Sequence, residues 1–328
     1  MSWIIGMLVM FGCSESPQQG TLPGGPVVPS APPLSNDLTL IPADLPPNTT
    51  SLRLAVTPYL GPELIDASWK PIARHLSERL GIPVLLVSAQ SYQQLIDLVA
   101  ENQIDIASLS PLSYVLAKQR APGLQVVAQE LAYGATSFSS YIMVRSDDPA
   151  RSIYDVVGKR IALVDPRSTS GFLFPYSTFL DHGIDPETDF KQVVFSGSHM
   201  ESIKLLNSGR VDVTAIGSGM MRSAVQNHPD DPLLAGANAR ILVKAGRIPF
   251  DPICLREDFP KTGAAKIQAA FLQLNTRTQA GRRILSASPK ISGWIAADDD
   301  YYDSVRRVQQ RVTAHRNNSQ AQQGKAAK

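Results

Sequence analysis

Short apolar runs alternate with stretches of helical spacing from about residue 53 onward. A short apolar run between turn residues predicts a buried strand, and apolar residues three and four positions apart predict a helix. The first half of the pattern predicts strands at 53–56, 82–87 and 105–109 and helices at 64–80, 91–99 and 111–118. Strands that alternate with helices predict an α/β fold with a parallel sheet.

The same order of elements returns after residue 160. The second set predicts strands at 160–164, 193–195 and 213–216 and helices at 172–180 and 199–206. Three residue pairs in the two sets are separated by the same 107 positions: Arg53 and Arg160, Tyr92 and His199, and Asp105 and Asp212. Matches in one order indicate two related lobes with a ligand cleft between them. Both aspartates precede buried strands and are interpreted as structural.

The chain is predicted to pass between the lobes more than once. Apolar runs at 141–144 and 240–244 end the two sets and are interpreted as crossover strands. The predicted boundaries are 51–142 and 247–315 for lobe 1, 143–246 for lobe 2, and 316–328 for a disordered tail that lacks an apolar pattern.

The N-terminal segment 1–13 is interpreted as a targeting signal. Its apolar run at 3–11 is too short to span a bilayer, and Gly12-Cys13 follows it. This pattern resembles a bacterial lipoprotein signal in which Cys13 carries the lipid, although Met1-Ser2 contains no Lys or Arg. A cleaved or vestigial segment in which Cys13 has no role is the alternative.

Residues 14–50 are rich in Pro, Gly, Ser and Thr and predict a semi-rigid tether. A tether that follows a lipid anchor would hold the folded part at a membrane surface. The hypothesis therefore places this protein on the periplasmic or cell-surface side, as a membrane-anchored lipoprotein.

Composition excludes several classes of function. The chain has 328 residues, 43% hydrophobic and 18% charged, which supports a folded core. Its formal net charge of +2 does not favour a nucleic-acid partner. The two cysteines, Cys13 and Cys254, cannot build a metal-ligand or redox cluster, so no metal or cofactor is predicted.

One turn between a predicted strand and a predicted helix is suited to an anion. Ser168, Thr169, Ser170 and Gly171 stand there, directly before the helical stretch. The first turn of a helix has unpaired backbone N–H groups and a partial positive charge, and the hydroxyls add donors. An ordinary helix cap is the alternative interpretation, because Ser and Thr are favoured at caps.

His199 follows Gly197-Ser198 at another predicted helix start. An anion bound there could keep the imidazole protonated. A capping or half-buried histidine is the alternative.

The chain from about 52 to 290 resembles the phosphate/phosphite/phosphonate-binding proteins that feed bacterial ABC importers. Five segments carry the resemblance: 105–114, the Ser168–Gly171 loop with Pro175, 197–199, 209–212, and 249–252 with Arg256. The resemblance implies a hinged, two-lobed periplasmic-binding-protein fold (type II-like) without catalytic activity. Its implied partners are a small phosphorus oxyanion and the permease and ATPase subunits of an ABC importer.

The same resemblance implies a set of ligand-binding residues. Ser168, Thr169, Ser170 and His199 would hold the phosphorus oxygens. Tyr114 and Tyr59 of the first lobe would close over the ligand, and Asp251 near the hinge would define its other end.

One departure from the family's pattern narrows the ligand. Members that bind aminoalkyl phosphonates place a carboxylate on the loop after the third strand of the second lobe, whereas this chain reads Gly217-Ser-Gly-Met220. Phosphite, phosphate, methylphosphonate or another small phosphonate therefore fits better than an aminoalkyl ligand.

Two other functions stay open from the sequence. An anion-sensing subunit that signals to a membrane kinase would need the same site. A phosphoryl-transfer enzyme is disfavoured, since the chain has no Walker-type lysine after the loop, no metal-ligand cluster and no nucleophile–base pair at a telling spacing.

Overall fold

The computed structural model describes residues 44–60, 62–227, 230–235, 238–288 and 290–326. The chain consists of two compact units, residues 1–35 and residues 36–328, and every described residue belongs to the second unit. The predicted signal segment, Cys13 and most of the predicted tether lie outside the described residues. Within the described ranges, no helix is both long and apolar enough to cross a membrane.

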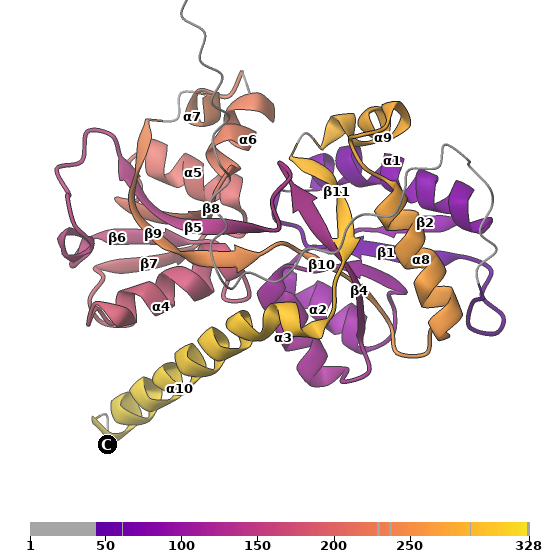
Figure 1. The fold of residues 1–328 in the computed structure, drawn as a ribbon. Helices are drawn as coiled ribbons and strands as arrows, with labels where there is room; N and C mark the ends of the chain where they lie inside the picture. Colours follow the sequence, from indigo (N-terminus) through magenta and orange to yellow (C-terminus); the bar gives the residue numbers. More distant parts are fainter. Residues whose placement is uncertain (1–43, 61, 228–229, 236–237, 289, 327–328) are drawn as a thin grey trace, which may run out of the picture. The chain divides into compact units, whose positions relative to one another are not determined.

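The described chain forms two sheets, each with helices packed on it (Figure 1). The first sheet, with its helices, is called lobe 1; its strand order is β11-β4-β10-β3-β1-β2. These strands are β1 (Leu52–Val56), β2 (Val84–Val87), β3 (Ile106–Ser108), β4 (Gln125–Ala132), β10 (Pro252–Leu255) and β11 (Ile291–Ala296). The β1, β2 and β3 strands are parallel, whereas β10 and β11 pair antiparallel with their neighbours.

The second sheet, with its helices, is called lobe 2; its strand order is β7-β6-β8-β5-β9. These strands are β5 (Ser137–Arg145), β6 (Arg160–Leu163), β7 (Gln192–Phe195), β8 (Val213–Gly217) and β9 (Ala239–Pro249). The parallel trio β7-β6-β8 repeats the trio β2-β1-β3, and an antiparallel strand follows the third strand in both sheets. The internal repeat predicted from the sequence is therefore present in the fold.

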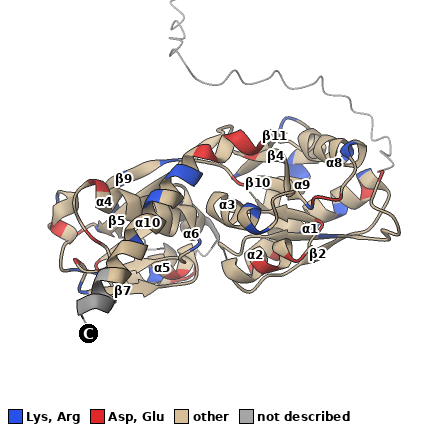
Figure 2. Ribbon diagram, turned by 90° about the horizontal axis from the view of Figure 1, so that it is seen from below, with Lys and Arg blue, Asp and Glu red and all other residues tan. Residues whose placement is uncertain are grey.

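Most helices connect consecutive strands along the chain, and α10 follows the last strand. They are α1 (Pro62–Leu80), α2 (Tyr92–Ala100), α3 (Pro111–Arg120), α4 (Phe174–Asp181), α5 (His199–Asn207), α6 (Met220–Asn227), α7 (Pro232–Ala235), α8 (Lys261–Gln273), α9 (Gln279–Ile284) and α10 (Asp303–Ala326). Shorter helical turns are η1 (Ile153–Val156), η2 (Thr169–Leu173), η3 (Leu285–Ala287) and η4 (Asp299–Tyr302). In the view of Figure 2, Lys and Arg residues are interspersed with Asp and Glu residues over these elements.

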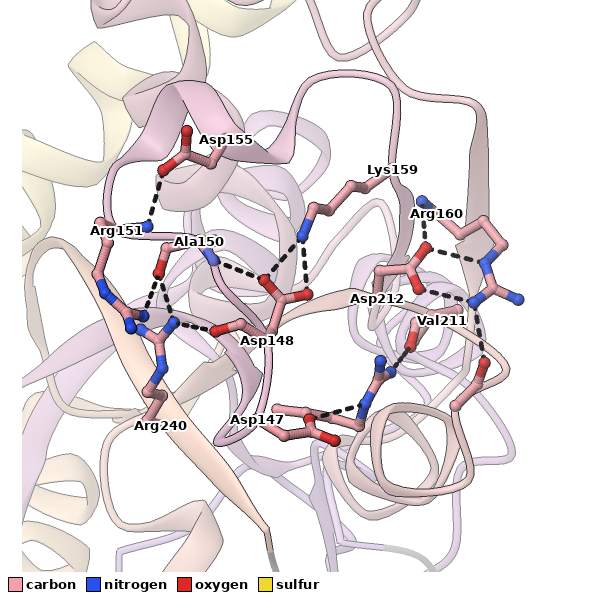
Figure 3. A network of polar contacts seen from close by, with 12 residues as sticks. Asp147, Asp148, Ala150, Arg151, Asp155, Lys159, Arg160, Val211, Asp212 and Arg240 are labelled. Carbon is pink, nitrogen blue, oxygen red and sulfur yellow. Dashed lines mark hydrogen bonds and ion pairs between the residues drawn. The ribbon is translucent and has the colours of Figure 1, made fainter.

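Equivalent ion pairs fix the two parallel trios. Asp105 accepts hydrogen bonds from the backbone N–H of Arg53 at 2.7 Å and from its Nε at 2.9 Å. Asp212 accepts the same two bonds from Arg160, at 3.0 and 2.9 Å (Figure 3). These bonds lower the pKa of Asp212 to about 2. Both aspartates are structural, as the sequence predicted, and the bonds show that they hold neighbouring strands together.

The lobe boundaries differ from the predicted ones. The runs at 141–144 and 240–244 belong to β5 and β9, which pair with each other along their length in the sheet of lobe 2. The chain therefore crosses between the sheets at 133–136 and again at 250–251. An apolar run marks a buried strand but not the sheet to which it belongs, so the predicted boundaries at 142 and 246 fell inside strands.

The C-terminal helix α10 corrects another prediction. It is helical to Ala326, through most of the 316–328 segment that was predicted to be disordered. Its first half packs on both lobes: Val312 is buried, and Arg311 Nη1 lies 2.6 Å from Asp181 Oδ1 of α4. A packed helix extends readily through Gln, Ala and Lys residues, which have high helix propensity even where no apolar face exists.

Candidate functional site

A cavity of about 440 Å³ lies between the lobes, and helix starts from both of them form its wall. Four of these helix starts are capped by a serine. Ser91, Ser110, Ser168 and Ser198 accept hydrogen bonds from the backbone N–H three residues later, at 3.1–3.3 Å. The caps begin α2, α3, η2 and α5 at the cavity. Several helix N-termini therefore direct their partial positive charge at one space.

The hydroxyl loop Ser168–Ser170 lines this cavity and is almost fully buried. Thr169 Oγ1 accepts a hydrogen bond from the backbone N–H of Leu112 in lobe 1 at 2.8 Å. Ser168 Oγ accepts from Gly171 N–H at 3.1 Å. A hydroxyl that accepts through its lone pairs keeps its proton to donate, so these side chains can donate to an anion.

Gly171 is required by close packing. A Cβ atom at this position would lie 2.3 Å from Val164 Cγ2, which no side chain can accommodate. The glycine therefore lets η2 lie directly against the end of β6.

His199 lines the cavity opposite lobe 1, at the start of α5. Its side chain is buried, and no described residue forms a hydrogen bond with its Nδ1. Burial, with a smaller contribution from Lys290, lowers the pKa of the imidazole to about 3. The imidazole is therefore neutral at neutral pH in this structure, with one N–H available to donate.

Two tyrosines of lobe 1 face the same space. Tyr59, which the sequence predicted, lines the cavity, and burial raises its pKa to about 12. Tyr92 also lines the cavity, and its hydroxyl interacts with Ser168 of lobe 2. The sequence repeat placed the loop of Ser91 and Tyr92 at the cleft, but Tyr92 was not named among the ligand-binding residues. The 107-residue offset from His199 was the signal that could have found it.

Tyr114 is corrected by the structure. Its side chain is fully buried, and its hydroxyl donates a hydrogen bond to Asp299. Its ring packs edge-on against Tyr302, with 5.0 Å between the ring centroids. The cavity wall takes Ser110 and Pro111 from the start of α3 but not Tyr114. One turn into the helix, the side chain faces η4 and α10 instead of the cleft.

A buried charged cluster stands at the crossings between the lobes. Asp251, which was predicted, lines the cavity at the second crossing. Lys290, which was not, also lines it; its Nζ lies 3.2 Å from Glu130 Oε1 and 4.4 Å from the centre of the Tyr59 ring. Glu130 is 1% exposed. Burial disfavours the ammonium, but the attraction of Glu130 and Tyr59 raises the pKa of Lys290.

Asp251 and Glu130 repel each other within this cluster. The backbone N–H of Glu130 donates to the carbonyl of Asp251 at 3.0 Å, so the two residues are adjacent. Burial, and then the Glu130 charge, raise the pKa of Asp251 from 3.8 to about 7, although Lys290 opposes the rise. The cluster therefore carries a titratable carboxyl near neutral pH.

Asp251→Asn is expected to change the pH dependence of stability. Because the folded-state pKa of Asp251 is raised to about 7, its contribution to stability is fully present below pH 3.8 and is lost as the pH rises through 7. Without ligand, wild type loses this contribution as the pH rises from 4 to 8, whereas the asparagine variant has no carboxyl to titrate. The unfolding free energy of the variant minus that of wild type should therefore increase by about 2–4 kcal/mol from pH 4 to pH 8. Urea unfolding at both pH values measures this. Equal pH dependence of Asp251→Asn, wild type and the exposed control Asp258→Asn would contradict it.

The candidate residues thus meet in one place, with one exception. Ser168, Thr169, Ser170, His199, Tyr59 and Asp251 all line the cavity, and Tyr114 does not. In the described ranges, no group of three or more His, Cys, Asp or Glu side chains is placed to hold a metal ion.

Two α/β lobes, connected by two chain crossings around a cavity, define the class of two-lobed solute-binding proteins. Residues 54–302 match the family described as ABC transporter, phosphonate, periplasmic substrate-binding protein. The chain belongs to this family, as the motifs had indicated. It is therefore a periplasmic substrate-binding protein of the ABC phosphonate or phosphate transporter type.

Known relatives agree with this assignment. The chain is 29% identical over 239 residues to the phosphonates-binding periplasmic protein of Escherichia coli (strain K12). The aligned residues cover 71% of this chain and 69% of that protein. It is 29% identical over 187 residues to the phosphate-import protein PhnD of Mycolicibacterium smegmatis, covering 52% and 58%.

A solved structure confirms the fold. The structure of PhnD1 from Prochlorococcus marinus in complex with methylphosphonate superposes with a TM-score of 0.73 at 20% identity, covering 80% of this chain and 98% of that one. The predicted two-lobed α/β architecture is thereby confirmed. Lipidation of Cys13 stays a prediction.

Proposed function

We propose that this protein binds a small phosphorus oxyanion, namely phosphite, phosphate or a small phosphonate, for delivery to the permease and ATPase of an ABC importer. The observation that carries the proposal is the Ser168–Ser170 loop. It presents three buried hydroxyls at a helix start, and His199 adds a buried nitrogen, Nδ1, that has no hydrogen-bond partner among the described residues. The mycobacterial relative is a phosphate-import protein, and the Prochlorococcus structure contains methylphosphonate.

In the proposed complex, both lobes contribute donors. Ser168, Thr169, Ser170 and His199 of lobe 2 would donate to the anion oxygens, and Tyr59 and Tyr92 of lobe 1 would close the other side. Hydrogen bonds to charged groups contribute roughly 1.5–3 kcal/mol each. Four or five such bonds, less the cost of association, reach micromolar affinity, about −8 kcal/mol.

The lobes already touch beside the proposed site. Leu112 N–H donates to Thr169 Oγ1, and Arg167 Nε donates to Gln93 Oε1 at 2.6 Å. A ligand between the lobes would add bonds to this contact and favour the closed arrangement, which the transporter would recognise. Lipidation at Cys13 would keep the protein beside its permease.

The charged cluster disfavours an aminoalkyl ligand. The loop Gly217–Met220 carries no carboxylate, and Asp251 is the acidic residue in the described cavity wall. Lys290 lines the same wall and lowers the pKa of Asp251 through its charge. A ligand ammonium beside Asp251 would therefore meet the like charge of Lys290.

Calorimetric titration of the full chain with phosphite, phosphate, methylphosphonate and 2-aminoethylphosphonate tests the function, with sulfate as a control anion. We expect micromolar or tighter binding of at least one of the first three, and binding of the aminoalkyl compound at least ten-fold weaker than methylphosphonate. Absence of binding by every phosphorus compound would overturn the proposed function. Tight binding of the aminoalkyl compound alone would overturn the charge argument.

A further inference from the structure

The cavity is much larger than the proposed headgroup. Its volume is about 440 Å³. A water molecule occupies roughly 30 Å³ of liquid, and methylphosphonate has five non-hydrogen atoms, so such an oxyanion fills only part of the space. The remaining volume is available to another part of the ligand.

An apolar wall begins directly beside the hydroxyl loop. A Cβ atom at Gly217 would lie 3.1 Å from Ser170 Oγ and 3.2 Å from Phe138 Cε2. Ser170 and Phe138 are therefore neighbours across this glycine. Phe138 stacks on Phe250, with ring centroids 4.9 Å apart and an interplanar angle of 25°. A group attached to a phosphorus atom held by Ser170 would meet these two rings.

The wall continues towards the start of α6. Tyr133 and Met220 also line the cavity. Gly219 has a φ of +89°, and a Cβ atom there would lie 3.7 Å from the Tyr133 ring. A side chain at either position would project towards the ring of Phe138 or of Tyr133, and Gly217 and Gly219 leave this space open. The guanidinium of Arg222 lies 5.5 Å from the centre of the Tyr133 ring.

The wall adjoins the charged cluster: Phe250 precedes Asp251 in the chain, and the backbone N–H of Tyr133 donates to the Lys290 carbonyl at 2.8 Å. Asp251 is the acidic residue among the described residues that line the cavity, and the charge of Lys290 already acts on it. A cationic substituent would therefore meet the like charge of Lys290 beside Asp251 and that of Arg222 beside Tyr133. The side chains that line the wall are suited to an uncharged group.

We propose that the cavity takes a phosphonate whose substituent is an uncharged apolar group of about the size of a phenyl ring, packed against Phe138, Phe250 and Tyr133. This substrate class rests on the proposed oxyanion function, because Ser168–Ser170 and His199 hold the phosphonate group.

Calorimetry of the full chain with methyl-, propyl- and phenylphosphonate tests the substrate class, since the three compounds share one headgroup. Each buried methylene strengthens binding about fourfold. We therefore expect phenylphosphonate to bind at least ten-fold more tightly than methylphosphonate, with propylphosphonate between them. Phenylphosphonate binding that is equal to or weaker than methylphosphonate binding overturns the substrate class and leaves the oxyanion function standing. Absence of binding by all three overturns the substrate class, and it overturns the oxyanion function as well only if phosphite and phosphate also fail to bind.

Variants of the apolar wall test where the substituent lies. Phe138→Ala is expected to reduce the ratio of the methylphosphonate to the phenylphosphonate dissociation constant at least threefold. Phe195→Ala is the matched control, because Phe195 is 46% exposed on β7 and does not line the cavity. Tyr133→Asn is the second variant, since Tyr133 is 53% exposed and asparagine accepts its φ of +51°. An unchanged ratio in both wall variants overturns the proposal.

Discussion

Replacement of Lys290 by methionine is expected to lower the free energy of unfolding by about 3–5 kcal/mol, because it leaves a buried carboxylate without its counter-charge. Glu130 is 1% exposed, and the Lys290 ammonium lies 3.2 Å from its Oε1. Neither carboxylate oxygen of Glu130 forms a hydrogen bond with another described residue. Asp251, a second carboxyl in the same cluster, adds repulsion when the lysine is removed. Urea unfolding without ligand measures the loss.

Two matched variants separate this effect from lost packing. Adding Glu130→Gln to Lys290→Met removes the uncompensated charge and should restore most of the stability. Lys70→Met breaks an exposed i,i+4 pair with Asp66 and should cost at most about 1 kcal/mol. If Lys290→Met lowers the free energy of unfolding no more than Lys70→Met does, the buried Lys290–Glu130 pair does not stabilise the fold as expected.

Replacement of His199 or Ser168 by alanine is expected to weaken binding of the preferred phosphorus oxyanion by about ten-fold to a hundred-fold, with little change in the other ligand contacts. Each change removes one donor to a charged group, worth roughly 1.5–3 kcal/mol. Both residues are buried in the cavity wall, and Nδ1 of His199 has no partner among the described residues. Calorimetry with the best ligand of the panel measures the affinity.

The control histidine for this experiment is His182. It is exposed at the end of α4, where its Nδ1 lies 2.8 Å from the Thr178 carbonyl, and it does not line the cavity. His182→Ala should bind like wild type. Ser168→Ala also removes the cap on η2, which costs about 1 kcal/mol of stability, so its unfolding is measured in parallel. Wild-type affinity in both His199→Ala and Ser168→Ala would show that the site lies elsewhere.

Most of the fold could be predicted from the sequence because its signals are local. Apolar runs and helical spacing identify the parallel trios of both sheets, and the 107-residue offset relates them. The serine before α5 and the serine before η2 act as caps, which explains why helix starts could be located so closely. The assignment of β5 and β9 to one sheet could not be predicted, because it depends on strand pairing between distant segments.

The candidate site shows the same limit. Ser168–Ser170 and His199 stand at helix starts, where the chain direction alone aims the first residues at the cleft. Tyr114 lies further along its helix, and its direction depends on η4 and α10, which follow it by more than a hundred residues. Its position in a loop-like motif gave no information about these later elements.

Nothing in the sequence around Lys290 predicted that this residue would line the cavity. It precedes β11 and reaches the cavity only because β11 pairs with β4, which brings Lys290 beside Tyr133 and Glu130. A single lysine in a turn is ordinarily an exposed residue. Only the three-dimensional pairing reveals that its charge is enclosed.

The two crossings also order the events of folding. Lobe 2 is one continuous stretch, from Ser137 at the start of β5 to Pro249 at the end of β9, so all its strands are available once that stretch has been synthesised. Lobe 1 cannot complete its sheet until β10 and β11 arrive, because Cys254 must pair with Ala107 and Trp294 with Glu130 across the whole of lobe 2. Pairing over so long a loop is slow. The inserted lobe should therefore be protected from proteolysis first as the chain refolds, while the enclosing lobe, and with it the ligand cavity, forms last.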